Sequence, residues 1–259
     1  MTFNLKQKAS MSPSGIMDAM VGKTSRDFTF ILDLIGTTEK IKLASSNNIN
    51  AKADIAYQQT HFIRVLALVA KAFPDVKVHQ ISDCAFLHSD NLISILTACT
   101  AVFKNMTNFG DRLSQFALRG GGAMGLTEFL ETDEFQKETS TMPNFKYSRL
   151  IGKGLVEANH LEKKGARGMR LFLTREVFDD LQRFQHPFKI RPSVTRDAID
   201  CYEVNWMSDD HFFKDYLGAS FSHGGVKDSL TLWGQSLQGH PELPVIELGN
   251  SLLELISWA

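Results

Sequence analysis

Two aspartates next to short apolar runs are the residues of this sequence best suited to chemistry. Asp33 closes the run FTFILD, and Asp83 lies between the runs VHQI and CAFL. An unpaired carboxylate in a buried strand is costly unless it finds a partner or a metal ion. Either aspartate alone could be a turn or cap residue, but together they indicate two oxygen ligands for a hard divalent cation.

A glycine follows the first aspartate closely, in the segment Asp33-Leu-Ile-Gly36-Thr37. The amides of such a turn can face phosphate oxygens, and glycine lets the backbone approach closely. Two metal ions bridged by two aspartates lower the pKa of an attacking hydroxyl and neutralise the charge on a leaving pyrophosphate. The pattern therefore predicts a metal site beside a phosphate-binding loop.

Three consecutive glycines follow Arg119 within an apolar run. Glycines weaken a strand, so we expect a bulge, or the close approach of a ligand or another chain. Arg119 could pair with a carboxylate inside the core, or it could donate hydrogen bonds to a base carbonyl or a phosphate. The sequence leaves both roles open.

Charged and polar side chains cluster in the segment IGKGLVEANHLEKKGARGMR, residues 151–170. Its helical spacing places Glu157 and Leu161 one turn apart, so we expect them to share a face. Glu162, with Lys163 and Lys164, is interpreted as part of a solvated surface.

The hydrophobic pattern predicts an α/β (α+β) protein with a ferredoxin-like split βαβ core. The element order β–α–β–β–α–β–(insertion)–α–β implies a mixed sheet covered by helices on one face. The predicted strands are residues 28–35, 76–81, 84–87, 116–126 and 169–173, and the predicted helices are residues 55–73, 91–106 and 154–164.

The chain divides into three predicted parts: a lead-in over residues 1–26, a catalytic core over 27–175, and a C-terminal extension over 176–259. Residues 127–147 are polar and are predicted to be an insertion or loop. The extension is predicted to be largely helical. Its elements are helices at 174–184, 226–237 and 247–258 and a strand at 201–207.

Composition predicts a cytoplasmic protein. Its 259 residues carry a formal net charge of −1, so no global field attracts nucleic acid or an anionic membrane. The three cysteines form no CxxC pair and fit buried thiols in a reducing compartment. The N-terminus has no signal-peptide pattern, and no run approaches the roughly 18 apolar residues of a membrane span.

Four segments in order, FILDLIGTT, ISDCAF, LRGGGAMG and GKGLVEANHLEKKGARG, resemble the class III nucleotidyl cyclases. More narrowly, they resemble the bacterial pyrimidine cyclases of Pycsar anti-phage defence, over about residues 28–173. The resemblance implies a head-to-tail homodimer with composite active sites, two Mn²⁺ or Mg²⁺ ions, and a downstream cyclic-nucleotide effector protein.

Site residues follow from this resemblance position by position. Asp33 and Asp83 are implied to bind the metal ions, with Ile35 contributing through its backbone. Arg119 is implied to stabilise developing charge, and Glu157 to bind substrate. The residues implied to hold the triphosphate lie shortly after Asp33 in the chain and are Ile35, Gly36, Thr37 and Thr38.

The expected reaction is conversion of a pyrimidine triphosphate to its 3′,5′-cyclic monophosphate and pyrophosphate. Many purine-specific members carry an Asn and an Arg one turn apart, where Glu157 and Leu161 are interpreted to stand here. UTP is favoured over CTP, because an arginine such as Arg119 can meet the uracil carbonyls. A palm-fold polymerase or diguanylate-type cyclase lacks support because no GGDEF-like hairpin is present. A degenerate cyclase domain that binds nucleotide or a partner without turnover is the alternative.

Overall fold

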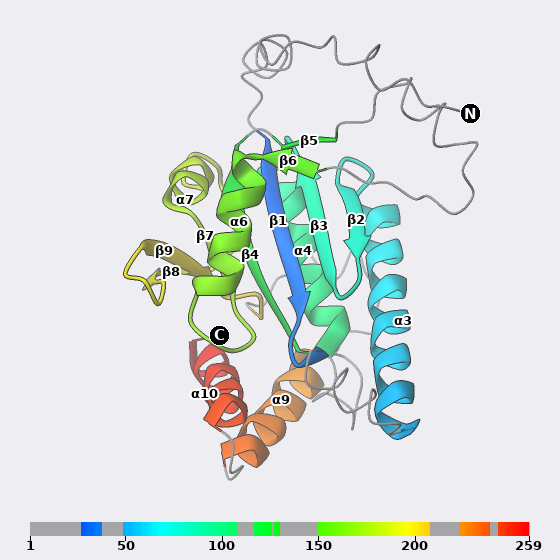
Figure 1. Cartoon of the computed structure of the whole chain (residues 1–259). Helices are drawn as coiled ribbons and strands as arrows, with labels where there is room; N and C mark the ends of the chain where they lie inside the picture. Colours follow the sequence, from blue (N-terminus) through cyan, green and yellow to red (C-terminus); the bar gives the residue numbers. More distant parts are fainter. Residues whose placement is uncertain are drawn as a thin grey trace, which may run out of the picture.

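The protein contains a seven-stranded mixed sheet with helices on both faces (Figure 1). The computed structural model describes residues 27–37, 49–107, 117–125, 127–129, 150–207, 223–238 and 243–258. The strands of the sheet, in chain order, are β1 (Phe28–Leu34), β2 (Lys77–Ile81), β3 (Cys84–Ser89), β4 (Leu118–Met124), β7 (Leu171–Leu173), β8 (Ile190–Val194) and β9 (Asp200–Val204). They lie in the order β2-β3-β1-β4-β7-β9-β8. Only the β4–β7 pair of this sheet is parallel, so the predicted mixed sheet is confirmed.

Six helices and a short two-stranded ribbon complete the described elements. The helices are α3 (Ile49–Ala72), α4 (Leu92–Thr107), α6 (Lys153–Lys164), α7 (Arg175–Leu181), α9 (His223–Gln238) and α10 (Leu243–Trp258). The ribbon pairs β5 (Thr127–Phe129) with β6 (Leu150–Gly152). Among the described residues, none of these helices is long and apolar enough to cross a membrane.

The sheet carries helices on two faces, so the prediction of one covered face is wrong. Side chains alternate along β1, because a strand directs successive residues to opposite faces. Phe30 and Leu32 pack into the main core with α3 and α4, whereas Ile31 packs with Ala158 of α6. Figure 1 shows α6 in front of β1 and β4, with α4 behind them. Each fully buried large side chain contributes about 1.5–3 kcal/mol.

Most predicted elements are present with shifted ends. Helix α3 starts at Ile49, before the predicted start at residue 55. Helix α4 is buried on nearly all sides, and its first turn is capped by Asn91, whose Oδ1 accepts from the Ser94 amide. The predicted 127–147 insertion begins with strand β5. The lead-in 1–26 lies outside the described residues.

The C-terminal extension contacts the core in two places, through its strands β8 and β9 and through helix α10. Strands β9 and β8 extend the central sheet beyond β7. The Met169 amide donates to Ser251 Oγ of α10 at 3.2 Å, and both Arg170 and Arg191 bind Glu254 of the same helix. These contacts hold α10 against the segment that leads into β7.

Candidate active site

Asp33 lies near the end of β1, the strand between β3 and β4. Its partners in the register are Cys84 on β3 and Arg119 on β4. Arg119 Nη2 donates a hydrogen bond to Asp33 Oδ2 at 3.0 Å. Of the two roles that the sequence left open for Arg119, pairing with a carboxylate is the one that the structure contains.

Asp83 lies beside Asp33, in the turn between β2 and β3. The Leu34 amide donates to the Asp83 carbonyl at 3.0 Å, which fixes this turn against the end of β1. Ser82 adopts a left-handed φ of 58°, which reverses the chain tightly. The two aspartates therefore lie close together, Asp33 near the end of β1 and Asp83 in the turn that leads into the neighbouring strand β3.

The electrostatics of Asp33 suit a cation. Burial raises the pKa of the Asp33 carboxyl, the neighbouring Arg119 opposes that rise, and the negative charge of Asp83 adds to it. A carboxylate whose pKa is raised by the charge of a neighbouring carboxylate gains from a divalent cation between the two. Among the described residues, no group of three or more His, Cys, Asp or Glu side chains forms a closed metal cage. In proteins, Mg²⁺ is usually bound by one or two carboxylates, and phosphate groups of the substrate complete its coordination. Asp33 and Asp83 therefore fit such an ion.

The turn after β1 is shaped by Gly36. Its φ of +84° is a conformation that favours glycine, and a Cβ there would meet no atom within 4 Å. The Ile35 amide donates to the Ala117 carbonyl at 2.8 Å, and the buried Thr37 hydroxyl donates to the Leu34 carbonyl at 3.2 Å. The side chain of Thr37 thus points inward. Thr38 lies outside the described residues.

The three glycines of β4 allow close packing within the chain itself. A Cβ on Gly121 would lie 2.8 Å from the Glu162 amide nitrogen and still closer to the Ala158 carbonyl of α6. On the other face, a Cβ on Gly122 would collide with the Phe30 ring. Of the expected explanations, close approach is right, but the approaching element is helix α6 rather than a ligand or another chain.

Glu162 is the site residue that the sequence interpretation missed. It is 6% exposed, not solvated as expected, and its Oε1 forms an ion pair with Arg119 Nε. Burial raises the pKa of Glu162 to about 7; the charge of Arg119 opposes that rise and the charge of Asp33 adds to it. The burial of Glu162 could have been predicted from the helical spacing, because the buried positions of α6 lie along one side of the helix. These positions are Gly154, Ala158, Leu161 and Glu162.

Glu157 and Leu161 do not form an accessible pair. Glu157 is half-buried with Oε1 3.4 Å from Lys153 Nζ, whereas Leu161 is 3% exposed and packs with Phe172 and Cys201. The interpretation of Leu161 as a position that faces nucleotide is therefore wrong. The residues one turn apart on the outward side are Val156 and His160, whose Nε2 lies 3.3 Å from Asp197 Oδ2. Neither is Asn or Arg.

Cys84 is not a nucleophile in this arrangement. It lies next to Asp33 in the register, and burial, supported by the charge of Asp33, raises the pKa of its thiol to about 12. The thiol therefore stays protonated at neutral pH.

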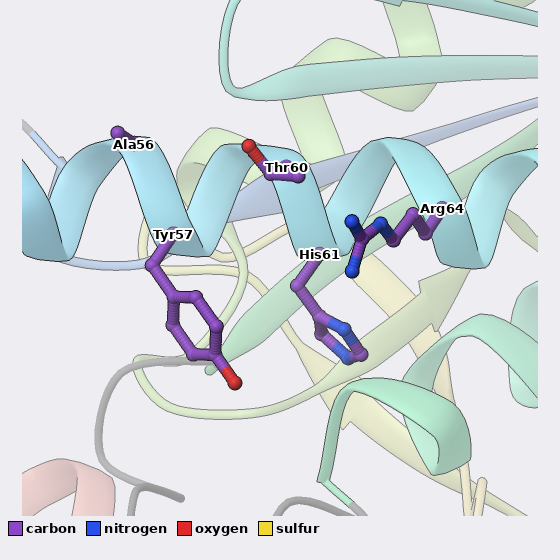
Figure 2. A pocket seen from close by; sticks show the side chains of 5 residues that line it. All are labelled: Ala56, Tyr57, Thr60, His61 and Arg64. Atoms are coloured by element: carbon purple, nitrogen blue, oxygen red, sulfur yellow. The ribbon is translucent and has the colours of Figure 1, made fainter.

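A cavity of about 410 Å³ lies on α3, apart from the aspartates. Figure 2 shows Tyr57 and His61 projecting from the same side of this helix, with Arg64 nearby. Burial lowers the pKa of His61. The described residues that line it all come from α3, which packs on the face of the sheet opposite α6. The Asp33 group, which combines residues from several elements, is the better candidate for chemistry.

Solved structures with the same arrangement of elements are cyclase domains. The guanylyl cyclase domain of the RhoGC fusion protein from the aquatic fungus Blastocladiella emersonii gives a TM-score of 0.51 at 13% identity, covering 70% of this chain and 96% of that one. A bacterial light-regulated adenylyl cyclase gives 0.52 at 10% identity, covering 89% and 57%. This chain has the class III nucleotidyl cyclase fold. The guanylate cyclase domain of RhGC from Catenaria anguillulae, solved with GTP, gives 0.50 at 13% identity, covering 70% and 96%.

The class III cyclase fold confirms the fold class expected from the four sequence segments. At 10–13% identity the likeness concerns the fold alone. No protein-family model matches the sequence, and no curated protein matches it. Within this class III fold, the chemistry of the present chain must be argued from its own residues.

Proposed function

We propose that this protein is a nucleotidyl cyclase that converts a pyrimidine nucleoside triphosphate to its 3′,5′-cyclic monophosphate and pyrophosphate. The observation that carries this proposal is the pair of Asp33, near the end of the central strand before the glycine turn, and Asp83, in the adjacent β2–β3 turn. The proteins that share the fold and are named adenylyl or guanylyl cyclases add support.

The roles of the residues follow from this site. Asp33 and Asp83, with the backbone of Ile35, would hold two Mn²⁺ or Mg²⁺ ions. Such ions lower the pKa of a hydroxyl and neutralise charge on the pyrophosphate. The backbone from Gly36 to Thr38 would face the triphosphate. In the reaction the 3′-hydroxyl oxygen bonds to the α-phosphorus and loses its proton, while the bond to the pyrophosphate oxygen breaks.

Arg119 remains the candidate for stabilising developing charge. Its side chain is 37% exposed, and its Nη2 and Nε atoms are engaged by Asp33 and Glu162. A substrate would therefore contact the guanidinium group of Arg119 at atoms other than Nη2 and Nε. An arginine that recognises a base normally does so with two free N–H groups. Because Arg119 already contacts Asp33 and Glu162, we favour a role for it beside the metal ions and the phosphates of the substrate.

A homodimer is part of the proposal. The outward side of α6 carries Val156, which is 67% exposed, and the β8–β9 turn region carries the exposed Val194 and Ile199. Apolar side chains left in water favour association. The Blastocladiella domain is described as dimeric. In the proposed dimer, Glu157 of α6 would reach the substrate bound at Asp33 of the other copy.

Selectivity for a pyrimidine rests on residues of α6, whereas the preference for UTP over CTP is carried over from the sequence analysis. The outward pair Val156 and His160 is not the Asn and Arg pair of many purine cyclases. A cytoplasmic location, a second-messenger role in anti-phage defence and a cyclic-nucleotide effector protein are supported by the sequence resemblance. The alternative, a degenerate domain that binds nucleotide or a partner without turnover, predicts no product.

Separate incubations with ATP, GTP, UTP and CTP, each with Mn²⁺ or Mg²⁺, test the proposal directly. We expect cyclic UMP and pyrophosphate, identified by mass, from the UTP reaction. Cyclic CMP as the main product would correct the base and leave the cyclase activity in place. Binding of nucleotide with no cyclic product in any reaction would favour the degenerate domain.

A further inference from the structure

We propose that Glu162 is a positioning residue of the metal site, which holds the Arg119 guanidinium so that the Asp33 carboxylate stays available to a divalent cation. The metal site itself belongs to the proposed function, on which this inference rests.

One guanidinium bridges two carboxylates from different elements. Arg119 Nη2 lies 3.0 Å from Asp33 Oδ2, and Arg119 Nε contacts Glu162 Oε1. The exposed fraction of the side chain is 20% for Asp33 but only 3% for Glu162. Above its pKa of about 7, where Glu162 is ionised, its buried carboxylate attracts Arg119 more strongly than a wetter one would, because less water screens the pair. Glu162 is therefore the stronger anchor of Arg119, and Asp33 the ligand more accessible to other cations.

The fold fixes Glu162 in this place. Helix α6 lies directly on the backbone of β4, because Gly121 leaves no Cβ between them. The Glu162 amide lies on this contact, and Ala158 one turn earlier packs against Ile31 of β1. The backbone of Glu162 is therefore held against the sheet, and its carboxylate is buried beside it. Glu162 thus acts as a fixed point and Arg119 as the movable partner.

The planar arginine fork explains why this anchor matters for a metal. With its Nε edge occupied by Glu162, Arg119 gives Asp33 a single hydrogen bond through Nη2. A free guanidinium would bind Asp33 with two parallel N–H groups, the strongest arrangement for this pair. That arrangement would neutralise Asp33 and oppose a cation at the same oxygen atoms. Removal of Glu162 is therefore expected to weaken metal binding through Arg119.

Glu162 could also act by its own negative charge, and other charges surround it. Asp83 lies beside Asp33, and Lys163 follows Glu162 in the chain. A direct charge effect would persist when Arg119 is absent, whereas a positioning effect would disappear. A double-mutant cycle separates the two, because coupling between residues in contact appears as non-additivity.

The test is the affinity for Mn²⁺ without nucleotide, measured by electron paramagnetic resonance of the free ion at mildly alkaline pH. Glu162→Met removes charge and acceptor and should raise the Kd for Mn²⁺ about tenfold. Glu162→Gln keeps a polar oxygen beside Arg119 Nε but removes the charge, so its Kd should rise less. In an Arg119→Gln background, Glu162→Met should change the Kd by less than about threefold. Glu176→Gln, at an exposed carboxylate paired with Lys153, serves as the control.

Each outcome has a distinct meaning. An unchanged Kd in folded Glu162→Met protein, or an equal change with and without Arg119, overturns the positioning role. Near-ultraviolet circular dichroism establishes folding, and if Glu162→Met does not fold, the same comparison is made with Glu162→Gln. Loss of Mn²⁺ binding in Asp33→Asn protein supports the proposed metal site independently. Retained binding in Asp33→Asn would overturn that site, and the positioning role with it.

Discussion

Arg119 and Asp33 lie opposite each other on neighbouring strands, and Arg119 Nη2 donates to Asp33 Oδ2 at 3.0 Å. The two residues are 86 positions apart in the sequence, and the antiparallel register of β1 and β4 brings them together. A residue that is expected to bind metal is thus already paired with a cation of its own chain. The strength of that pairing sets how readily the carboxylate accepts another cation.

Loss of either aspartate should abolish turnover without unfolding the protein. Asp33→Ala or Asp83→Ala removes a metal ligand, which should lower kcat/KM on the order of 10³-fold or more. Burial raises the pKa of Asp33, so its charged form is unfavourable in the folded state, and Arg119 keeps Glu162 as a partner. Thermal unfolding of Asp33→Ala should therefore match the wild type. Near-normal cyclase activity of either variant at saturating metal would contradict the two-aspartate site.

The contact between Gly121 and α6 should be sensitive to a single methyl group. Gly121→Ala places a Cβ against the Ala158 carbonyl and the Glu162 amide, both of which are backbone groups. Overpacking of this kind lowers the free energy of unfolding by roughly 1–3 kcal/mol. Urea unfolding measures the change, with Val156→Ala on the outward side of α6 as the control. Equal stability of Gly121→Ala and wild type would show that α6 does not lie as closely as described.

Glu162 should make the stability of the metal-free protein depend on pH. Its folded pKa of about 7 lies above the ordinary 4.5, so folding favours the protonated form. The contribution of Glu162 to the free energy of unfolding is complete below pH 4.5 and is lost as the pH rises to about 7. Glu162→Gln lacks this titration, so its melting temperature relative to wild type should increase across that range. A constant difference would mean that Glu162 titrates normally.

The composite site of the proposed dimer predicts complementation. An Asp33→Ala chain and a Glu157→Ala chain should each be inactive alone, because each spoils both sites of its own homodimer. A mixed dimer keeps one intact site, so mixing should restore up to about half of the wild-type activity per mixed dimer. Sedimentation reports the assembly in the same samples. A fully active monomer would exclude a shared site.

The sequence predicted the structure best where a residue suited to chemistry lies next to a clear hydrophobic pattern. The apolar run before Asp33 specifies β1, the short hairpin at Asp83 specifies β2 and β3, and both carboxylates lie at the ends of these strands. Strand β8 was not predicted, because Pro192 cannot donate to a ladder and makes the segment resemble a loop. Proline is tolerated there since β8 is the edge of the sheet.

Glu162 shows why residue type can mislead. Its neighbours Lys163 and Lys164 favoured a solvated surface, yet its phase on the helix places it in the buried stripe with Ala158 and Leu161. The docking of α10 could not be predicted, because the contact between Met169 and Ser251 joins residues 82 positions apart. The division into lead-in, core and extension, and the backbone roles of residues 35–38, stay predictions.

A reaction of the wild-type protein with an equal mixture of the four nucleoside triphosphates and Mn²⁺, followed by mass analysis of all cyclic products, tests the central claim most directly. Cyclic UMP should dominate, accompanied by pyrophosphate in equal amount, and Asp33→Ala protein should give none. Absence of every cyclic nucleotide from the wild-type reaction would contradict the cyclase function, and cyclic AMP as the main product would contradict pyrimidine selectivity.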